Sequence, residues 1–219
     1  GWHTFLQQKN LPFNSIASTV HTRNIFNRIR GEAESASMEL AAEYGEPIWC
    51  RGTGMRNTHL LAVAPTVSNS VICGGISAGI EPLPANVYTF NGAKGTFIRK
   101  NKVLEELLES KGENKEKWWK QMLQEGGSVL GLPDNVLTAE EKDVFLTFSE
   151  TNQLELVKQA AERQKYIDQT QSLNLAFSPT DSPKWINQVH MEAWKLGVKT
   201  LYYLRTDSII KGDLGSRMA

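Results

Sequence analysis

The chain has 219 residues, of which 40% are hydrophobic and 22% charged, and its 24 basic side chains balance its 24 acidic ones. This length suffices for one domain, or two small ones, with a buried core. The zero net charge argues against a nucleic-acid partner, and no apolar run approaches the roughly 18 residues that a membrane span requires. Cys50 and Cys73 are too few for a disulfide framework, so we expect a reducing, cytoplasmic location.

The first third of the chain predicts a long helix and then a buried strand. Apolar residues recur at three- and four-residue steps over residues 24–44, and Gly45 is expected to end this helix. The predicted buried stripe consists of Ile25, Ile29, Ala36, Leu40 and Tyr44. The apolar run at residues 60–64, ended by Pro65, is typical of a strand covered on both faces, as in α/β proteins.

Helices and strands alternate in the rest of the chain. We expect strand and turn pieces over residues 87–99, helices over 103–111 and 115–124, and a further helix from Thr138, which forms a capping box with Glu141. The stretch QLELVKQAAERQKYIDQT also predicts a helix, and QSLNLAF alternates like a strand with Leu173, Leu175 and Phe177 on one face. No repeat or linker divides the chain, which predicts one α/β domain or part of one.

Residues 182–206, SPKWINQVHMEAWKLGVKTLYYLRT, predict a helix followed by a strand. Ser182 and Pro183 are typical of a helix start, and Gly197 of a helix end. The strand carries two adjacent phenols, Tyr202 and Tyr203. Because neighbouring side chains of a strand point to opposite faces, the residues alone favour one core tyrosine and one surface tyrosine.

The loop PTVSNS, residues 65–70, follows the predicted buried strand, at the position where ligands bind in α/β folds. Its hydroxyl groups, its amide and the backbone N–H groups ahead of a possible helix suit the oxygens of a phosphate group. It lacks the lysine of a P-loop, so a phosphate cradle and a plain polar turn are equally supported by the residues.

Metal and nucleophile hypotheses find little support. The four histidines, His3, His21, His59 and His190, lack the spacing of zinc ligands. Cys73 lies beside glycines without a charged neighbour to lower its pKa, so we expect it to be a small buried hydrophobic residue.

Four motifs in order resemble the C-terminal part of the large (α) subunit of class I ribonucleotide reductase: GMRNTHLLAVAPTVSNS, GIEP, IDQTQSLNLAF and LGVKTLYYLRT. The resemblance covers most of residues 1 to 206. It implies an α/β fold that is the second half of a ten-stranded α/β barrel of the ribonucleotide reductase type, with residues 207–219 as a flexible tail.

The resemblance also implies an activity, the reduction of ribonucleoside diphosphates to deoxyribonucleotides by a radical mechanism. The loop residues Pro65, Thr66, Val67, Ser68 and Asn69 would bind the substrate diphosphate, although Asn69 departs from the hydroxyl residue often found there. Tyr202 and Tyr203 would relay a radical from a β subunit, with Tyr203 nearer that subunit. Two phenols would serve because the path has two hops.

No cofactor is expected on this chain: the radical would come from the metal cofactor of the β subunit, and thioredoxin or glutaredoxin would supply electrons. Cys50 and Cys73 do not match the family's catalytic cysteines, so activity would require an N-terminal α piece as well as the β subunit. The opening GWHTFLQQ suggests a cut rather than a natural start. A non-catalytic remnant that only binds partner subunits, or part of a cobalamin-dependent reductase, are the alternatives.

Overall fold

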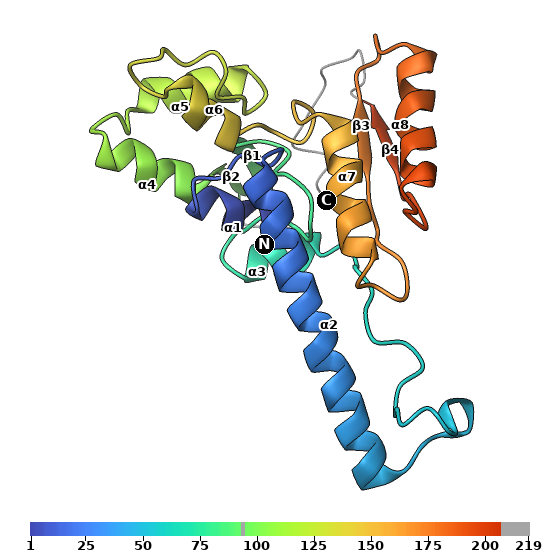
Figure 1. Cartoon of the computed structure of the whole chain (residues 1–219). Helices are drawn as coiled ribbons and strands as arrows, with labels where there is room; N and C mark the ends of the chain where they lie inside the picture. Colours follow the sequence, from blue (N-terminus) through green and yellow to red (C-terminus); the bar gives the residue numbers. More distant parts are fainter. Residues whose placement is uncertain (93–94, 207–219) are drawn as a thin grey trace.

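The computed structural model describes residues 1–92 and 95–206, shown in Figure 1. The helices within these residues are α1 Trp2–Gln8, α2 Ile16–Tyr44, the 3-10 helix η1 Ile48–Cys50, α3 Val67–Ile72, α4 Lys102–Ser110, α5 Glu116–Gln124, α6 Ala139–Val144, α7 Gln153–Gln164 and α8 Pro183–Lys195. None of them is long and apolar enough to cross a membrane. The predicted flexible tail, residues 207–219, lies outside the described residues.

In the described part of the chain, four strands form two small sheets. Strands β1 Val87–Gly92 and β2 Gly95–Lys100 make an antiparallel hairpin in which Val87 pairs with Lys100. Strands β3 Leu175–Phe177 and β4 Leu204–Thr206 pair in parallel, with Leu175 opposite Leu204, and α8 connects them. The predicted alternation of helices and strands is therefore confirmed in the second half of the chain, where a parallel pair requires such a crossover helix.

Two separate hydrophobic clusters form the core of residues 1–92 and 95–206. In Figure 1, helices α4, α5 and α6 gather on one side of the molecule, and α7, β3, β4 and α8 on the other. The first cluster packs α1, α7 and α8 around the buried face of β3, where Leu173, Leu175 and Phe177 are buried as their alternation predicts. The second cluster packs α4, α5 and α6 on Val87 of β1.

Local capping signals give the helix ends that the sequence predicts. The Thr138 side chain accepts a hydrogen bond from Glu141 N–H while the Glu141 carboxylate accepts one from Thr138 N–H, which completes the capping box of α6. Ser182 caps α8 with Pro183 in the first turn, and Gly197 follows with a φ of 78°. These contacts involve neighbours in sequence, which is why they are predictable.

Helix α2 differs from its prediction in both start and buried face. It begins at Ile16 rather than at residue 24, because Ser15 caps it by accepting from Ser18 N–H. Its buried residues are small or polar, Ser18, Thr22, Ser37 and Ala41, whereas the predicted stripe is largely exposed, with Tyr44 62% accessible. The reason is visible in Figure 1: the second half of α2 projects away from the body, so it has little to pack against.

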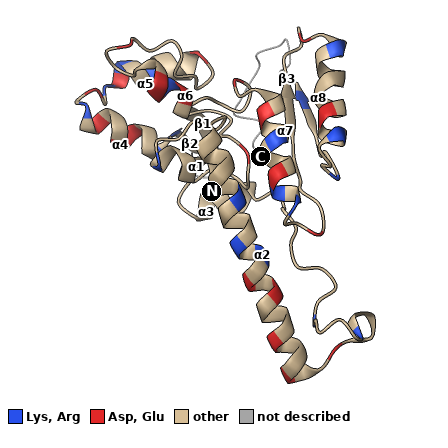
Figure 2. Ribbon diagram, viewed as in Figure 1, with Lys and Arg blue, Asp and Glu red and all other residues tan. Residues whose placement is uncertain are grey.

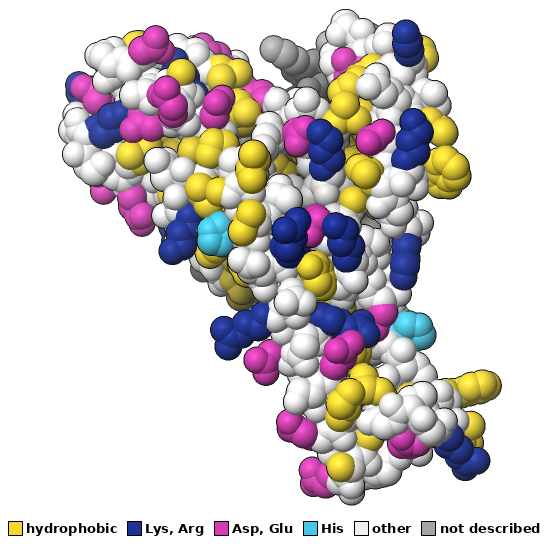
Figure 3. All heavy atoms as spheres, in the orientation of Figure 1, with side chains coloured by type: hydrophobic (Ala, Val, Ile, Leu, Met, Phe, Trp, Pro, Cys, Tyr) yellow, Lys and Arg dark blue, Asp and Glu magenta, His cyan; other side chains and the backbone are white. Residues whose placement is uncertain are grey.

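The charges of α2 are not arranged to favour its helix dipole. Its arginines lie in the first half and its glutamates in the second, as Figure 2 shows, which is opposite to the arrangement that the helix dipole favours. Ion pairs nevertheless form within the helix, where Arg28 lies 3.7 Å from Glu32 and Arg30 lies 2.6 Å from Glu34. Others join the helix to the body: Arg23 lies 2.7 Å from Glu162 and Arg30 lies 3.0 Å from Asp168. The projecting end carries exposed hydrophobic side chains, seen in the space-filling view of Figure 3.

The prediction of a strand buried on both faces is wrong for residues 60–64. Only Val63 forms a bridge, in parallel with Gln171, and both Ala62 and Ala64 are exposed. Val63 N–H donates to Thr170 (3.0 Å) and its carbonyl accepts from Ser172 (2.9 Å). Within the described residues the segment is paired along one edge only, so neither face is covered as the apolar run predicts.

Candidate functional site

The rings of Tyr202 and Tyr203 lie against each other rather than on opposite faces of a strand. Their centroids are 4.1 Å apart with the ring planes at 51°, and both side chains are about half exposed. The prediction of one core and one surface tyrosine is therefore wrong. Hydrogen bonding with Tyr203 raises the pKa of the Tyr202 phenol.

An extra residue in the chain opposite Asn174 explains this arrangement. Tyr202 N–H donates to the carbonyl of Leu173 (2.8 Å), and Leu175 N–H donates to the carbonyl of Tyr203 (2.9 Å). In a regular parallel ladder a single residue makes both of these bonds, but here two consecutive residues share them. This is a β-bulge just ahead of β4, and it interrupts the alternation that would send the two phenols to opposite faces.

The loop at residues 65–69 leads into the short helix α3. Thr66 is its N-cap residue, and Ser70 N–H makes the first intrahelical bond, to the carbonyl of Thr66 (2.9 Å). The N–H groups of Val67, Ser68 and Asn69 precede that bond and therefore have no intrahelical acceptor. Ser68 and Asn69 are exposed, whereas Ser70 is buried and donates to the carbonyl of Val67 (2.6 Å).

Hydrogen bonds connect this loop with the tyrosine pair. The Thr66 hydroxyl oxygen accepts from Gly79 N–H (2.8 Å), which fixes the GIEP segment against the loop. The Glu81 carboxylate accepts from the backbone N–H of Asn174 (2.7 Å) and from its side-chain amide (3.0 Å). The Asn174 amide oxygen in turn accepts from Tyr203 N–H (3.2 Å). The structure thus connects Thr66 of the loop with Tyr203 through the GIEP segment and Asn174.

Neither Glu81 nor Asn174 was assigned a role from the sequence. Both occur in motifs that resemble the reductase family, GIEP and QSLNL, and Asn174 interrupts an otherwise apolar alternation. Asn174 is 6% exposed. A buried amide in an apolar strand needs hydrogen-bond partners, and this requirement is the sequence signal that could have identified Asn174.

Arg163 is fully buried and interacts electrostatically with Glu81 of this network. Arg163 Nε donates to the amide oxygen of Gln171 (3.1 Å), and Nη2 has no hydrogen-bond partner among the described residues. Burial lowers the pKa of Arg163 to about 9, and the charge of Glu81 opposes that effect. Glu81 is therefore the negative charge that partly compensates a buried cation.

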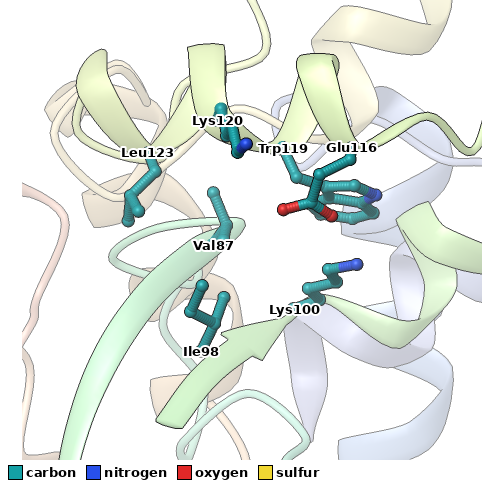
Figure 4. Close-up of a pocket in the computed structure, with 7 residues that line it drawn as sticks. All are labelled: Val87, Ile98, Lys100, Glu116, Trp119, Lys120 and Leu123. Carbon is teal, nitrogen blue, oxygen red and sulfur yellow. The ribbon is translucent and has the colours of Figure 1, made fainter. Parts of the chain in front are cut away.

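A small hollow lies away from this network, between α5 and the β1–β2 hairpin (Figure 4). The side chains of Trp119 and Leu123 from α5 face Val87 and Ile98 across it, with Lys100 and Glu116 at its edge. Its volume of about 20 Å³ holds a water molecule but not a nucleotide.

The remaining candidates from the sequence are the histidines and cysteines considered as metal ligands or nucleophiles. His3 is buried, and the His190 ring stacks on Phe177 with centroids 6.2 Å apart. Cys50 is buried, but the prediction that Cys73 is a buried hydrophobic residue is wrong, since it is exposed at the end of α3. Residues 1–92 and 95–206 contain no group of three or more His, Cys, Asp or Glu side chains that could hold a metal ion.

Comparison with known proteins identifies the fold family. The family model described as ribonucleotide reductase, barrel domain, matches residues 50–204, which is more than half of the chain. The chain belongs to the ribonucleotide reductase barrel family. Its mixed α/β architecture, with a parallel β3–β4 pair joined by α8, is accordingly part of that barrel.

Individual relatives agree with this assignment. The ribonucleoside-diphosphate reductase large subunit of Invertebrate iridescent virus 6 is 41% identical over 215 residues, covering 97% of this chain, and that of Danio rerio is 31% identical over 228 residues, covering 89%. The solved structure described as the Actinobacillus ureae class Id ribonucleotide reductase alpha subunit superposes with a TM-score of 0.88 at 41% identity over 99% of this chain.

The chain spans only part of these relatives. It corresponds to 22% of the viral large subunit, 28% of the Danio rerio one and 39% of the Actinobacillus ureae chain. Sites of the relatives that lie elsewhere in their sequences have no counterpart among these residues.

Proposed function

We propose that the chain supplies the substrate diphosphate loop and the tyrosine radical relay of a ribonucleoside-diphosphate reductase α subunit. The observation that carries the proposal is the contact between the Tyr202 and Tyr203 rings, 4.1 Å between centroids, in a member of this family. The names of its relatives, large subunit and alpha subunit, support an enzyme that also contains a second type of subunit.

The relay needs two phenols that exchange a hydrogen atom. A radical on the β subunit takes one electron and one proton from the Tyr203 hydroxyl group and is itself reduced, so Tyr203 becomes a phenoxyl radical. The resulting Tyr203 phenoxyl takes a hydrogen atom from the Tyr202 hydroxyl group, so Tyr203 is restored and Tyr202 carries the radical inward. Adjacent rings shorten this transfer, and their half-exposed position leaves Tyr203 accessible to a partner protein.

The loop at residues 65–69 binds the diphosphate of the substrate in this proposal. The N–H groups of Val67, Ser68 and Asn69 are donors ahead of α3, and the side chains of Ser68 and Asn69 can add further donors. Thr66 Oγ1 accepts from Gly79 N–H, which leaves its own O–H free to donate to a phosphate oxygen. Pro65 sets the direction from which the chain enters the loop.

The partners follow from the same proposal. A β subunit with a metal cofactor supplies the radical, a thiol protein such as thioredoxin or glutaredoxin supplies electrons, and the preceding part of the α subunit supplies the reducing cysteines. Cys50 is buried, and it lies on η1 rather than in the network of Thr66, Glu81 and Asn174.

Phenylalanine substitutions test the relay. Tyr202→Phe and Tyr203→Phe keep the ring and its packing but remove the oxidisable O–H, at a cost of about 1 kcal/mol in the free energy of unfolding. In the complex with the rest of the α subunit and the β subunit, we expect turnover to fall to background in each variant while the thermal midpoint changes little.

Tyr44→Phe is the matched control. Tyr44 is a similarly exposed tyrosine, but it lies at the end of the projecting helix α2, so its substitution should leave turnover unchanged. Full turnover in either Tyr202→Phe or Tyr203→Phe would remove that residue from the relay. Full turnover in both would favour the interpretation of the pair as a purely structural feature.

A further inference from the structure

We propose that Asn174 and Glu81 are positioning residues that maintain the β-bulge and so keep the rings of Tyr202 and Tyr203 in contact. This inference rests on the proposed function for its catalytic meaning. The ring contact itself, however, can be measured without turnover.

The bulge creates a backbone donor that the ladder cannot satisfy. Tyr202 N–H and the Tyr203 carbonyl make the two ladder bonds around Asn174, so Tyr203 N–H is left over. The Asn174 amide oxygen accepts from this N–H at 3.2 Å. This bond is partly buried, and the side chain of Asn174 thereby supplies the acceptor that the ladder no longer offers to Tyr203 N–H.

Glu81 fixes the direction in which the Asn174 amide points. A carboxylate only accepts hydrogen bonds, so the amide NH2 of Asn174 must face Glu81 and its oxygen must face Tyr203. The second carboxylate oxygen of Glu81 holds the Asn174 backbone N–H at 2.7 Å. The two bonds together hold residue 174 in place, with its amide in the orientation that serves Tyr203.

Glu81 is itself held by its surroundings. Gly79 N–H is bonded to Thr66, and Leu83 N–H donates to His3 Nδ1 (2.9 Å), so the segment is anchored on both sides of Glu81. The buried Arg163 provides an opposing positive charge. The tyrosine pair is thereby connected to the same segment that packs against the proposed substrate loop.

Without the bulge, alternation along the strand would separate the phenols. Successive side chains of a regular strand point to opposite faces, as the sequence alone predicted for Tyr202 and Tyr203. The contact at 4.1 Å between centroids therefore depends on the extra residue, and the extra residue depends on an acceptor for Tyr203 N–H.

A donor–acceptor exchange tests the inference. Asn174→Asp places a carboxylate against Glu81 and removes the amide donor, so the two side chains repel each other. In the Glu81→Gln/Asn174→Asp double variant, the amide belongs to residue 81 and the carboxylate to residue 174. The net charge then equals that of the wild type, and bonds to Tyr203 N–H and to the backbone of residue 174 can form again.

The measurement is the nuclear Overhauser effect between the two rings in the purified chain with labelled tyrosine, assigned with the Tyr202→Phe and Tyr203→Phe variants. We expect the inter-ring signal in the wild type, its loss in Asn174→Asp and its return in the double variant. In the assembled enzyme, turnover should fall on the order of 100-fold in the single variant and recover in the double variant.

Asn86→Asp is the control for a general loss of stability. Asn86 is 1% exposed and donates to the carbonyls of Phe145 (2.7 Å) and Gly127 (3.1 Å), remote in sequence from the bulge. It should lower the thermal midpoint without removing the inter-ring signal.

Two outcomes would overturn the inference: a folded Asn174→Asp variant that keeps the inter-ring signal, or a double variant that does not regain it. If Asn174→Asp alone does not fold, the double variant decides, and recovery of both folding and ring contact supports the inference. Full turnover in the tyrosine variants would reject the relay, whereas the ring signal reports on the positioning residues alone.

Discussion

Acidification should destabilise the fold through His3. This side chain is 1% exposed; its Nδ1 accepts from Leu83 N–H (2.9 Å), and its Nε2 lies 3.3 Å from the carbonyl oxygen of Val144. Neutral histidine with its proton on Nε2 satisfies both partners. Protonation of Nδ1 would place its N–H against the N–H of Leu83 and leave a buried positive charge. The contact that would be lost is one of those that anchor the segment around Glu81.

The size of the effect follows from the pKa. Burial lowers the pKa of His3 from 6.5 to about 4. Because the folded-state value lies below the unfolded-state value, the contribution of His3 to stability is complete above pH 6.5 and is lost as the pH falls through about 4. A difference of that size corresponds to about 3 kcal/mol in the free energy of unfolding.

Urea unfolding of the chain between pH 7 and pH 4 measures this loss. His3→Asn keeps an acceptor near Leu83 N–H but cannot titrate, so the difference in pH dependence between wild type and variant isolates His3 from the carboxylates. His59→Gln, at an exposed position, should follow the wild type. Equal pH dependence in wild type and His3→Asn would refute the reasoning.

Two further predictions concern the loop and the packing. In the assembled enzyme, Ser68→Ala should raise the apparent KM for a ribonucleoside diphosphate by about fivefold, the equivalent of one hydrogen bond. Ser68→Asp should raise this KM well beyond that, because its charge repels the diphosphate. Equal, negligible effects of the two substitutions would make the loop a plain turn. Gly127→Ala should lower the free energy of unfolding by at least about 2 kcal/mol more than Gly126→Ala. Both glycines have positive φ, but only at Gly127 would the added methyl group overlap Ala85, so similar urea midpoints for the two variants would contradict this packing.

The local features of the fold were predictable from the sequence. The capping box of Thr138 and Glu141, the Ser182–Pro183 helix start and the buried face of Leu173 and Leu175 depend on residues close together in the chain. Their side chains meet whenever the local helix or strand forms. The order of the four motifs likewise indicated the family, because it requires no spatial information.

The predictions that were wrong concern features that depend on residues distant in sequence. The apolar stripe of α2 predicted burial, but whether a helix face is covered depends on which other elements lie beside it, and the second half of α2 projects from the body. The run at residues 60–64 was predicted as a fully covered strand, yet it bonds to residues 169–172 along one edge only.

The tyrosine pair shows the same division most directly. The sequence by itself determined that two phenols are adjacent and that the chain resembles a radical enzyme. It could not determine that their rings touch, because alternation along a strand predicts the opposite. Only the tertiary structure decided this, by placing Asn174 where its amide oxygen accepts the N–H that the bulge leaves over, and Glu81, 93 residues away in sequence, where it orients that amide.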